Sequence, residues 1–337
     1  MRIPASYPMA LLAALLALVP VYILITLASD ATAVFDSHNL KILGNTLSLM
    51  VLTVIGSILI GVPLAFISAY VQLPFKKLWL VLFAAPLAIP SYIGAFTLYA
   101  AFGPGGEINQ LLGFEPPPMY GLTGAAIVMT LYTFPFVMLT TRSSLLSLDA
   151  SMVNAARTLG MSMPMSVFKV ILPRVINGIA AGSLLVALYT LSDFGTPAMM
   201  RLDTFTRVIY VEYNAFGLSR AAMLSLQLMV IVGFLLFIES QIKTASERHG
   251  RPLMLFPSNG QKLAMLVTFL PVLLLAICLP LAIFTLWLAR DGVADFDFSI
   301  AWNSAYASGI AAIVAVVVAV PVAHAALSGK VGRIMER

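Results

Sequence analysis

The feature that most constrains this chain is the recurrence of apolar stretches long enough to cross a membrane. A helix needs about 20 predominantly apolar residues to span the hydrocarbon core of a bilayer. Only helices and closed barrels satisfy their backbone hydrogen bonds in lipid, so the sequence predicts an all-α, polytopic membrane protein with about eight transmembrane helices. The expected spans are 8–29, 44–70, 78–102, 121–139, 175–191, 221–242, 263–289 and 305–327.

Composition agrees with this interpretation and excludes several classes of function. Only 10% of the 337 residues are charged, compared with about a quarter in soluble proteins. The single cysteine, Cys278, excludes an intrachain disulfide scaffold. Basic residues are scattered singly between apolar stretches, so we expect the lipid bilayer and not nucleic acid as a partner. The sequence contains no protease motif or catalytic Cys/His arrangement, so we expect no enzyme, no bound cofactor and no metal.

The positions of the charged residues indicate an orientation. If the N-terminus is cytoplasmic, most of the 19 lysines and arginines lie on the cytoplasmic side and most of the 14 acidic residues lie on the opposite side. The positive-inside rule therefore favours a cytoplasmic N-terminus. Ala31-Thr32-Ala33 resembles a signal-peptide cleavage site, but the apolar core before it is longer than in signal peptides. A retained anchor is the favoured interpretation.

An incomplete internal repeat suggests how the chain is divided. When Asn303 is aligned with Asn45, Pro321 falls on Pro63, and in both copies a basic segment follows the span. A tandem repeat with an incomplete second unit explains this pattern, so we expect the chain to be cut short. The expected divisions are an N-terminal anchor with its outer loop (1–43), a first unit (44–245), a cytoplasmic linker (246–262) and the start of a second unit (263–337).

Two further patterns concern the packing of the spans. Pro86 and Pro90 lie within the third stretch, and we expect kinks there because neighbouring helices can satisfy the freed carbonyls. Gly178 and Gly182 are four residues apart on the fifth span, which permits close contact with another helix. So short a match also arises by chance, and both interpretations stay open.

The cytoplasmic segment after the fourth span predicts two short helices joined by an elbow. Asp149 or Ser151 can cap the first helix, and Gly160 permits the left-handed turn that ends it. Ser162 can cap the second helix, with Pro164 tolerated in its first turn. Small residues and methionines on these helices offer adaptable contact with another surface, so we expect this segment to have a partner.

The same segment resembles the EAA loop in the membrane subunits of bacterial ABC importers. Asn154-Ala155-Ala156 is followed after three residues by Gly160 and, nine residues later, by Val170-x-Leu172-Pro173. The resemblance implies a type I permease-like bundle whose loop, here 148–174, forms a coupling helix that docks on an ATP-hydrolysing subunit. The family's usual Glu is Asn154 here, so a charged contact made by that Glu is not expected. The implied coupling residues are Asn154, Ala155, Ala156, Arg157, Leu159, Gly160, Leu172 and Pro173.

A second resemblance concerns the substrate. The segment 191–199 is similar to the segment after the fifth span in ferric-iron permeases, and thiamine and phosphonate permeases look similar there. Ferric iron is therefore the leading substrate, with thiamine, phosphonate or polyamine as alternatives. In this segment Asp193, Gly195 and Pro197 are candidates for the translocation path or its outer mouth. Asp193 can equally be an interfacial cap, with Gly195 and Pro197 forming a turn.

The resemblance also implies partners and a location. They are ATP-binding cassette ATPase subunits, which use the ATP, a periplasmic substrate-binding protein, and either the missing second half or a second permease chain. The location is the bacterial inner membrane. An ion-coupled secondary transporter is the rival function, but it needs buried acids at the membrane midplane, and the sequence has almost none. A membrane scaffold without transport activity would leave the spacing of the loop unexplained.

Overall fold

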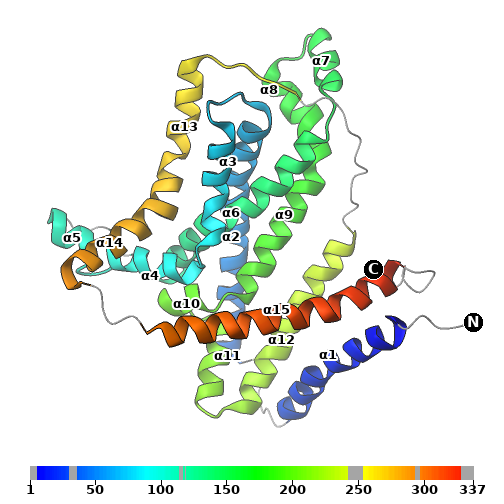
Figure 1. Ribbon diagram of the computed structural model, residues 1–337, viewed down its shortest axis with the longest axis vertical. Coiled ribbons are helices and arrows are strands. Elements are labelled where there is room, and N and C mark those ends of the chain that lie inside the picture. Colours follow the sequence, from blue (N-terminus) through cyan, green and yellow to red (C-terminus); the bar gives the residue numbers. More distant parts are fainter. Residues whose placement is uncertain are drawn as a thin grey trace, which may run out of the picture.

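The computed structural model describes residues 6–29, 36–113, 117, 119–241, 253–292 and 297–327, and these form a helical bundle (Figure 1). The helices are α1 (Ser6–Ala28), α2 (Ser37–Tyr70), α3 (Lys76–Ala84), α4 (Ser91–Phe102), α5 (Glu107–Leu112), α6 (Gly121–Leu146), α7 (Ala150–Thr158), α8 (Met163–Ser166), α9 (Leu172–Ser192), α10 (Gly195–Met199), α11 (Phe205–Asn214), α12 (Leu218–Gln241), α13 (Asn259–Leu273), α14 (Leu279–Asp291) and α15 (Phe298–Leu327).

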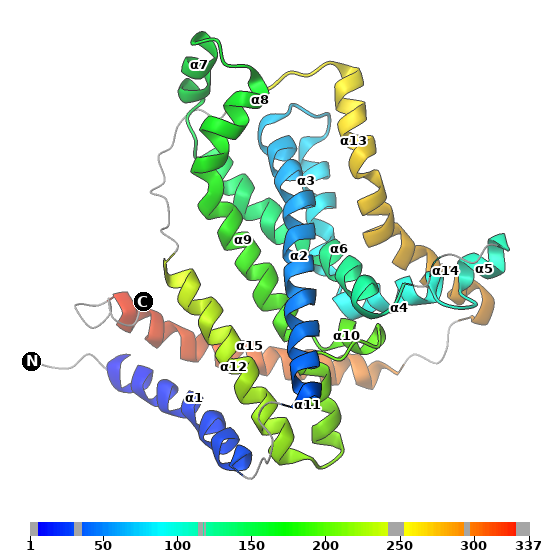
Figure 2. The same ribbon diagram turned by 180° about the vertical axis from the view of Figure 1, so that it is seen from behind.

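The centre of the bundle is formed by α2, α6 and α9, which lie side by side in both views (Figures 1 and 2). Buried apolar side chains of α2, α6 and α9, including Leu64, Phe134 and Val175, belong to one hydrophobic cluster. The close packing depends on the two glycines of the fifth span. A Cβ at Gly182 would lie 2.6 Å from Val137 Cα, and one at Gly178 would lie 2.1 Å from Ser144 Oγ. The close-contact interpretation of these glycines is therefore confirmed.

Six helices of the described chain are long and apolar enough to cross a membrane, and a bent pair makes up to seven. The first expected stretch forms the apolar helix α1. The all-α, polytopic prediction is confirmed. The six are Ser37–Tyr70, Gly121–Leu146, Met163–Ser192, Leu218–Gln241, Asn259–Asp291 and Phe298–Val320.

The third expected stretch is broken instead of kinked. Its two parts, Lys76–Ala88 and Ser91–Leu111, meet at an angle of 88°. Ile89 between them has an extended backbone (φ −95°, ψ 120°), the conformation that a following proline imposes. Pro90 then precedes the first residue of α4 and carries no N–H to continue a helix. The expectation of one kinked span was wrong, because the extended backbone at Ile89 and the missing N–H of Pro90 interrupt the helix at two neighbouring residues.

Two spans contain a short π-helical segment before a proline. Val167–Ile171 lies two residues before Pro173, and Leu274–Cys278 lies two residues before Pro280. A proline removes one backbone donor and clashes with the carbonyl four residues earlier, and a wider turn relieves that clash. As a result α8 is continuous with α9, so the second expected short helix is the beginning of the fifth span.

The helix pair α13–α14, which was expected to open a second unit, packs against α6. Tyr132 of α6 donates a hydrogen bond of 3.0 Å from its hydroxyl to the carbonyl of Ala276, in the π-helical segment between α13 and α14. Leu273 and Ala276 are buried in clusters that also contain α6 side chains. By contrast, α15 crosses the direction of α2 in both views and contacts α1, and its side chains from Phe298 to Val320 are exposed (Figures 1 and 2).

Candidate functional site: an exposed helix at the end of the bundle

The expected coupling loop forms a short helix that stands at one end of the bundle, beyond α9 (Figure 1). Asp149 caps α7, because its carboxylate accepts a hydrogen bond of 2.9 Å from the backbone N–H of Ser151. Asp149, and not Ser151, is therefore the N-cap of α7. Ser162 caps α8 as predicted, accepting from the backbone N–H of Met165 at 3.4 Å.

Gly160 forms the predicted elbow between the two helices. Its φ is +87°, in the left-handed region that only glycine adopts easily. The Gly160 N–H donates to the carbonyl of Arg157 at 3.0 Å, and the Met161 N–H donates to the carbonyl of Ala156 at 3.1 Å. A Cβ at Gly160 would meet nothing within 4 Å. The backbone conformation, and not crowding, therefore requires a glycine here.

The structure divides the expected coupling residues of α7 between two faces. Of these residues only Ala156 is buried. It faces the bundle together with Val153, which was not among the expected coupling residues and which joins a cluster with Tyr70 and Ile171. The remaining residues are exposed, and the Leu159 side chain is 84% exposed. The expected small pair is therefore split, since Ala156 faces inward and its neighbour faces outward. The exposed members are Asn154, Ala155, Arg157, Leu159 and Gly160.

The last two expected coupling residues lie apart from α7. Leu172 is partly buried against the same hydrophobic cluster, and Pro173 is exposed in the first turn of α9. Both residues belong to α9 and lie outside the exposed face of α7.

A segment after α12 lies against this end of the bundle. We call residues 253–258 the strap. The backbone N–H of Leu255 donates to the carbonyl of Tyr70 at 2.8 Å, and the N–H of Gln72 donates to the carbonyl of Leu255 at 3.2 Å. Leu253 is 8% exposed and belongs to the cluster that contains Val153. This part of the expected cytoplasmic linker is therefore bonded to the end of α2.

The candidates at the outer mouth come together around Asp193. Ser91 donates to one carboxylate oxygen at 2.9 Å, and the backbone N–H of Thr196 donates to the other at 3.0 Å. Gly195 packs against Tyr92, whose Cβ would lie 2.5 Å from a Cβ at Gly195. Pro197 is buried in α10. The geometry is that of a cap that also fixes the start of α4 to α10.

Sequence reasoning missed one polar cluster. Glu107 on α5 accepts hydrogen bonds from Trp287 and Arg290 on α14, in a region where its side chain is almost fully buried. An acidic residue in a glycine-rich turn gave no signal of partners so distant in sequence. Among the residues that the structure describes, no group of three or more His, Cys, Asp or Glu side chains is arranged to hold a metal ion.

Residues 61–242 match the family described as "Binding-protein-dependent transport system inner membrane component", and this match covers more than half of the chain. The chain belongs to this family. The resemblance drawn from the loop spacing is thereby confirmed, and with it a multi-pass inner-membrane component of the permease type.

Relatives in this family differ in the substrate that their names state. The Fe(3+)-transport system permease protein FbpB 2 of Haemophilus influenzae is 28% identical over 315 residues, 89% of this chain and 60% of that protein. A probable molybdenum ABC transporter permease of Haloferax volcanii is 29% identical over 63% of this chain and 79% of its own. The spermidine/putrescine permease PotB of H. influenzae is 29% identical over 61% of this chain and 76% of its own.

Solved structures give a weaker likeness. The inward-facing MetNI methionine ABC transporter has a TM-score of 0.46 and 15% sequence identity, over 62% of this chain and 97% of that chain.

Proposed function

We propose that this chain is the membrane permease subunit of an ATP-driven importer that receives substrate from a periplasmic binding protein. The exposed helix α7 is the observation that carries this proposal. Leu159, which is 84% exposed at the C-terminal cap of α7, and the exposed residues Asn154, Ala155 and Arg157 form a face that fits an interface with another protein. The family assignment argues against the rival ion-coupled secondary transporter.

In this proposal ATP is hydrolysed on separate ATPase subunits, and each of these subunits binds one coupling helix. The exposed face of α7 makes that contact, while Val153 and Ala156 transmit its movement into the bundle. A change between outward and inward openings then follows from rigid-body motion of packed helices. In this proposal the end of the bundle that carries α7 is cytoplasmic. The positive-inside pattern supports a cytoplasmic N-terminus as a further part of the proposal. A second permease unit, supplied by the same polypeptide or by another chain, provides the second coupling helix.

The domain organisation follows the same proposal. Residues 44–245 form a first permease domain, 246–262 a cytoplasmic linker and 263–337 the beginning of a second permease domain, after the anchor at 1–43.

Ferric iron is the proposed substrate. The iron permease relative aligns with 89% of this chain, whereas the molybdenum and polyamine relatives align with 63% and 61%.

The test is capture of the candidate ATPase subunit by the purified chain in detergent. Leu159→Arg should abolish capture, because it places a charge at the exposed C-terminal cap of α7. Phe216→Arg is the matched control, since Phe216 is 89% exposed in the α11–α12 connection, far from α7. Unchanged capture by Leu159→Arg would contradict the proposed interface.

Uptake of radiolabelled iron(III), molybdate and spermidine by cells that express the complete system then distinguishes between the candidate substrates.

Two matched glycine substitutions, one of them at Gly160, test the elbow in the same capture assay. Gly160→Arg and Gly113→Arg impose the same left-handed strain at positions where a Cβ meets nothing within 4 Å. Only Gly160→Arg should reduce ATPase capture, and equal losses for both variants would point to general destabilisation instead.

A further inference from the structure

Tyr70, the last residue of α2, is buried where several parts of the chain meet, at the end of the bundle that carries α7 (Figure 1). Its hydroxyl donates a hydrogen bond of 3.0 Å to the carbonyl of Leu145 on α6. Its backbone carbonyl accepts a hydrogen bond of 2.8 Å from the N–H of Leu255 in the strap. Its ring belongs to the hydrophobic cluster that contains Val153 of α7. One residue therefore links α2, α6, α7 and the strap.

The hydroxyl bond holds the chain just before α7. Leu145 lies in the last turn of α6, and Asp149, the N-cap of α7, follows four residues later. Val153 of α7 is 3% exposed in the same cluster as Tyr70. Close-packed interiors transmit strain. A displacement of α7 therefore acts on Tyr70 through the short link from α6 and through the packed cluster.

The backbone bond of Tyr70 leads to α13. The strap ends at Ser258, which is the N-cap of α13. The Ser258 hydroxyl accepts a hydrogen bond of 3.4 Å from the N–H of Gln261, and the Gln261 side chain accepts one of 3.0 Å from the N–H of Ser258. Such a capping box fixes the direction in which the chain enters a helix. A movement of the strap is therefore passed on to the first turn of α13.

We propose that Tyr70 is a positioning residue that couples α7 to the strap, so that an ATPase subunit bound at α7 also acts on the helix pair α13–α14. The inference rests on the proposed function of α7 as the ATPase contact. The hydroxyl of Tyr70 holds the link between α6 and α7, and the carbonyl of the same residue holds the strap. The two segments cannot shift separately while both bonds are intact. Coupling between two sites is reciprocal, so a partner that orders α7 also orders the strap.

Amide hydrogen exchange of the full chain, alone and in complex with its ATPase subunit, tests this coupling. In wild type, ATPase binding should slow exchange at Leu255, whose N–H is bonded to Tyr70. Tyr70→Phe keeps the ring and the backbone carbonyl and removes only the hydroxyl. The slowing should then be about two- to tenfold smaller, the effect expected for one hydrogen bond. Capture of the ATPase should persist, because the exposed face of α7 is unchanged.

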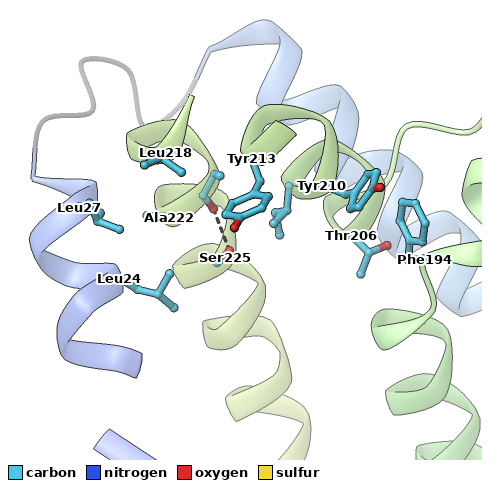
Figure 3. A pocket seen from close by; sticks show the side chains of 11 residues that line it. Leu24, Leu27, Phe194, Thr206, Tyr210, Tyr213, Leu218, Ala222 and Ser225 are labelled. Carbon is cyan, nitrogen blue, oxygen red and sulfur yellow. Dashed lines mark hydrogen bonds between the residues drawn. The ribbon is translucent and has the colours of Figure 1, made fainter. Parts of the chain in front are cut away.

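Two tyrosines provide matched controls. Tyr132 is 3% exposed, and its hydroxyl also donates to a carbonyl at 3.0 Å, but the cluster around it contains no described residue of α7 or the strap. Tyr213 lines an apolar crevice between α1, α11 and α12, at the end of the bundle opposite α7 (Figures 1 and 3). Tyr132→Phe and Tyr213→Phe should both keep the full slowing at Leu255.

The outcomes distinguish this inference from the proposed function. Failure of wild type to capture the ATPase would overturn both. Capture without slowing at Leu255 in wild type would overturn the coupling alone. Equal slowing in wild type and Tyr70→Phe would also overturn it, because the ATPase would then protect the strap without the hydroxyl. An equal reduction in Tyr70→Phe and Tyr132→Phe would overturn it as well, since the effect would then reflect general stability.

Discussion

Trp287 donates a hydrogen bond of 2.7 Å from its indole Nε1 to Oε1 of Glu107, across 180 residues of sequence. Arg290 adds an ion pair of 2.8 Å to Oε2 of the same carboxylate. Glu107 is 7% exposed and the Arg290 side chain is 41% exposed, so the carboxylate end of this cluster is desolvated while the guanidinium remains in contact with solvent. It fixes the end of α14 to α5, in the same region where Trp287 packs edge-on against Phe96 of α4.

Removal of this carboxylate should destabilise the protein. Glu107→Ala is expected to lower the free energy of unfolding by about 1–3 kcal/mol, the usual cost of losing a hydrogen bond to a charged group. Thermal unfolding in detergent measures the change. Glu239→Ala is the control, because Glu239 is an exposed acid on α12 and should change the midpoint little. Equal midpoints for the two variants would show that the cluster contributes no stability.

Glycine-to-alanine substitutions in the spans should destabilise the protein where the glycine is in close contact with another helix and should not do so where it faces open space. Gly182→Ala places a Cβ 2.6 Å from Val137 Cα, so α6 and α9 must separate. Such overpacking costs about 1–3 kcal/mol. Gly233→Ala meets nothing within 4 Å and should be neutral or stabilising, since alanine favours the helix. The same unfolding assay compares them, and an equal loss in both would contradict close packing at Gly182.

The contact between α4 and α10 depends on Ser91 and Asp193. A double-mutant cycle with Ser91→Ala and Asp193→Ala should give a coupling energy of about 1 kcal/mol, because the serine hydroxyl donates directly to the carboxylate. Additive losses would mean that the hydrogen bond does not contribute. A transport defect in Asp193→Ala without one in Ser91→Ala would favour a role of the carboxylate in the outer mouth.

The strap should be held by its buried leucine. Leu253→Ala is expected to cost about 2–4 kcal/mol, as for other buried leucines. Phe256→Ala is the control, since Phe256 is 77% exposed in the same segment. Amide hydrogen exchange at Leu255 reports the result locally, and it should accelerate only in the Leu253 variant. Equal exchange in the two variants would mean that the strap is held by its backbone bonds alone.

Local chemistry explains what the sequence could predict. Asp149, Gly160 and Ser162 act on backbone groups within three residues of themselves, so the caps and the elbow are readable from spacing. The apolar length of the spans is equally local. The break at Ile89 and Pro90 was missed because a hydropathy pattern does not distinguish a straight span from one that turns through 88°.

Tertiary packing decides the rest. Ala155 and Ala156 are identical residues, yet only Ala156 is buried, and the choice depends on how α7 lies against the bundle. The cluster of Glu107, Trp287 and Arg290 joins helices that are distant in sequence. Spacing along the sequence does not predict such a pairing, because the pairing arises only when α14 packs beside α4.

The backbone pairing between Leu255 and Tyr70 has a consequence for how the polypeptide can be divided. The helix pair α13–α14 is attached to earlier parts of the chain at both of its ends, by the strap bonded to Tyr70 and Gln72 at one end and by Glu107 at the other. Its attachment therefore does not depend on the peptide link between α12 and the strap. Two genes that encode residues 1–247 and 248–337 should complement each other when coexpressed, as the parts of a split protein do.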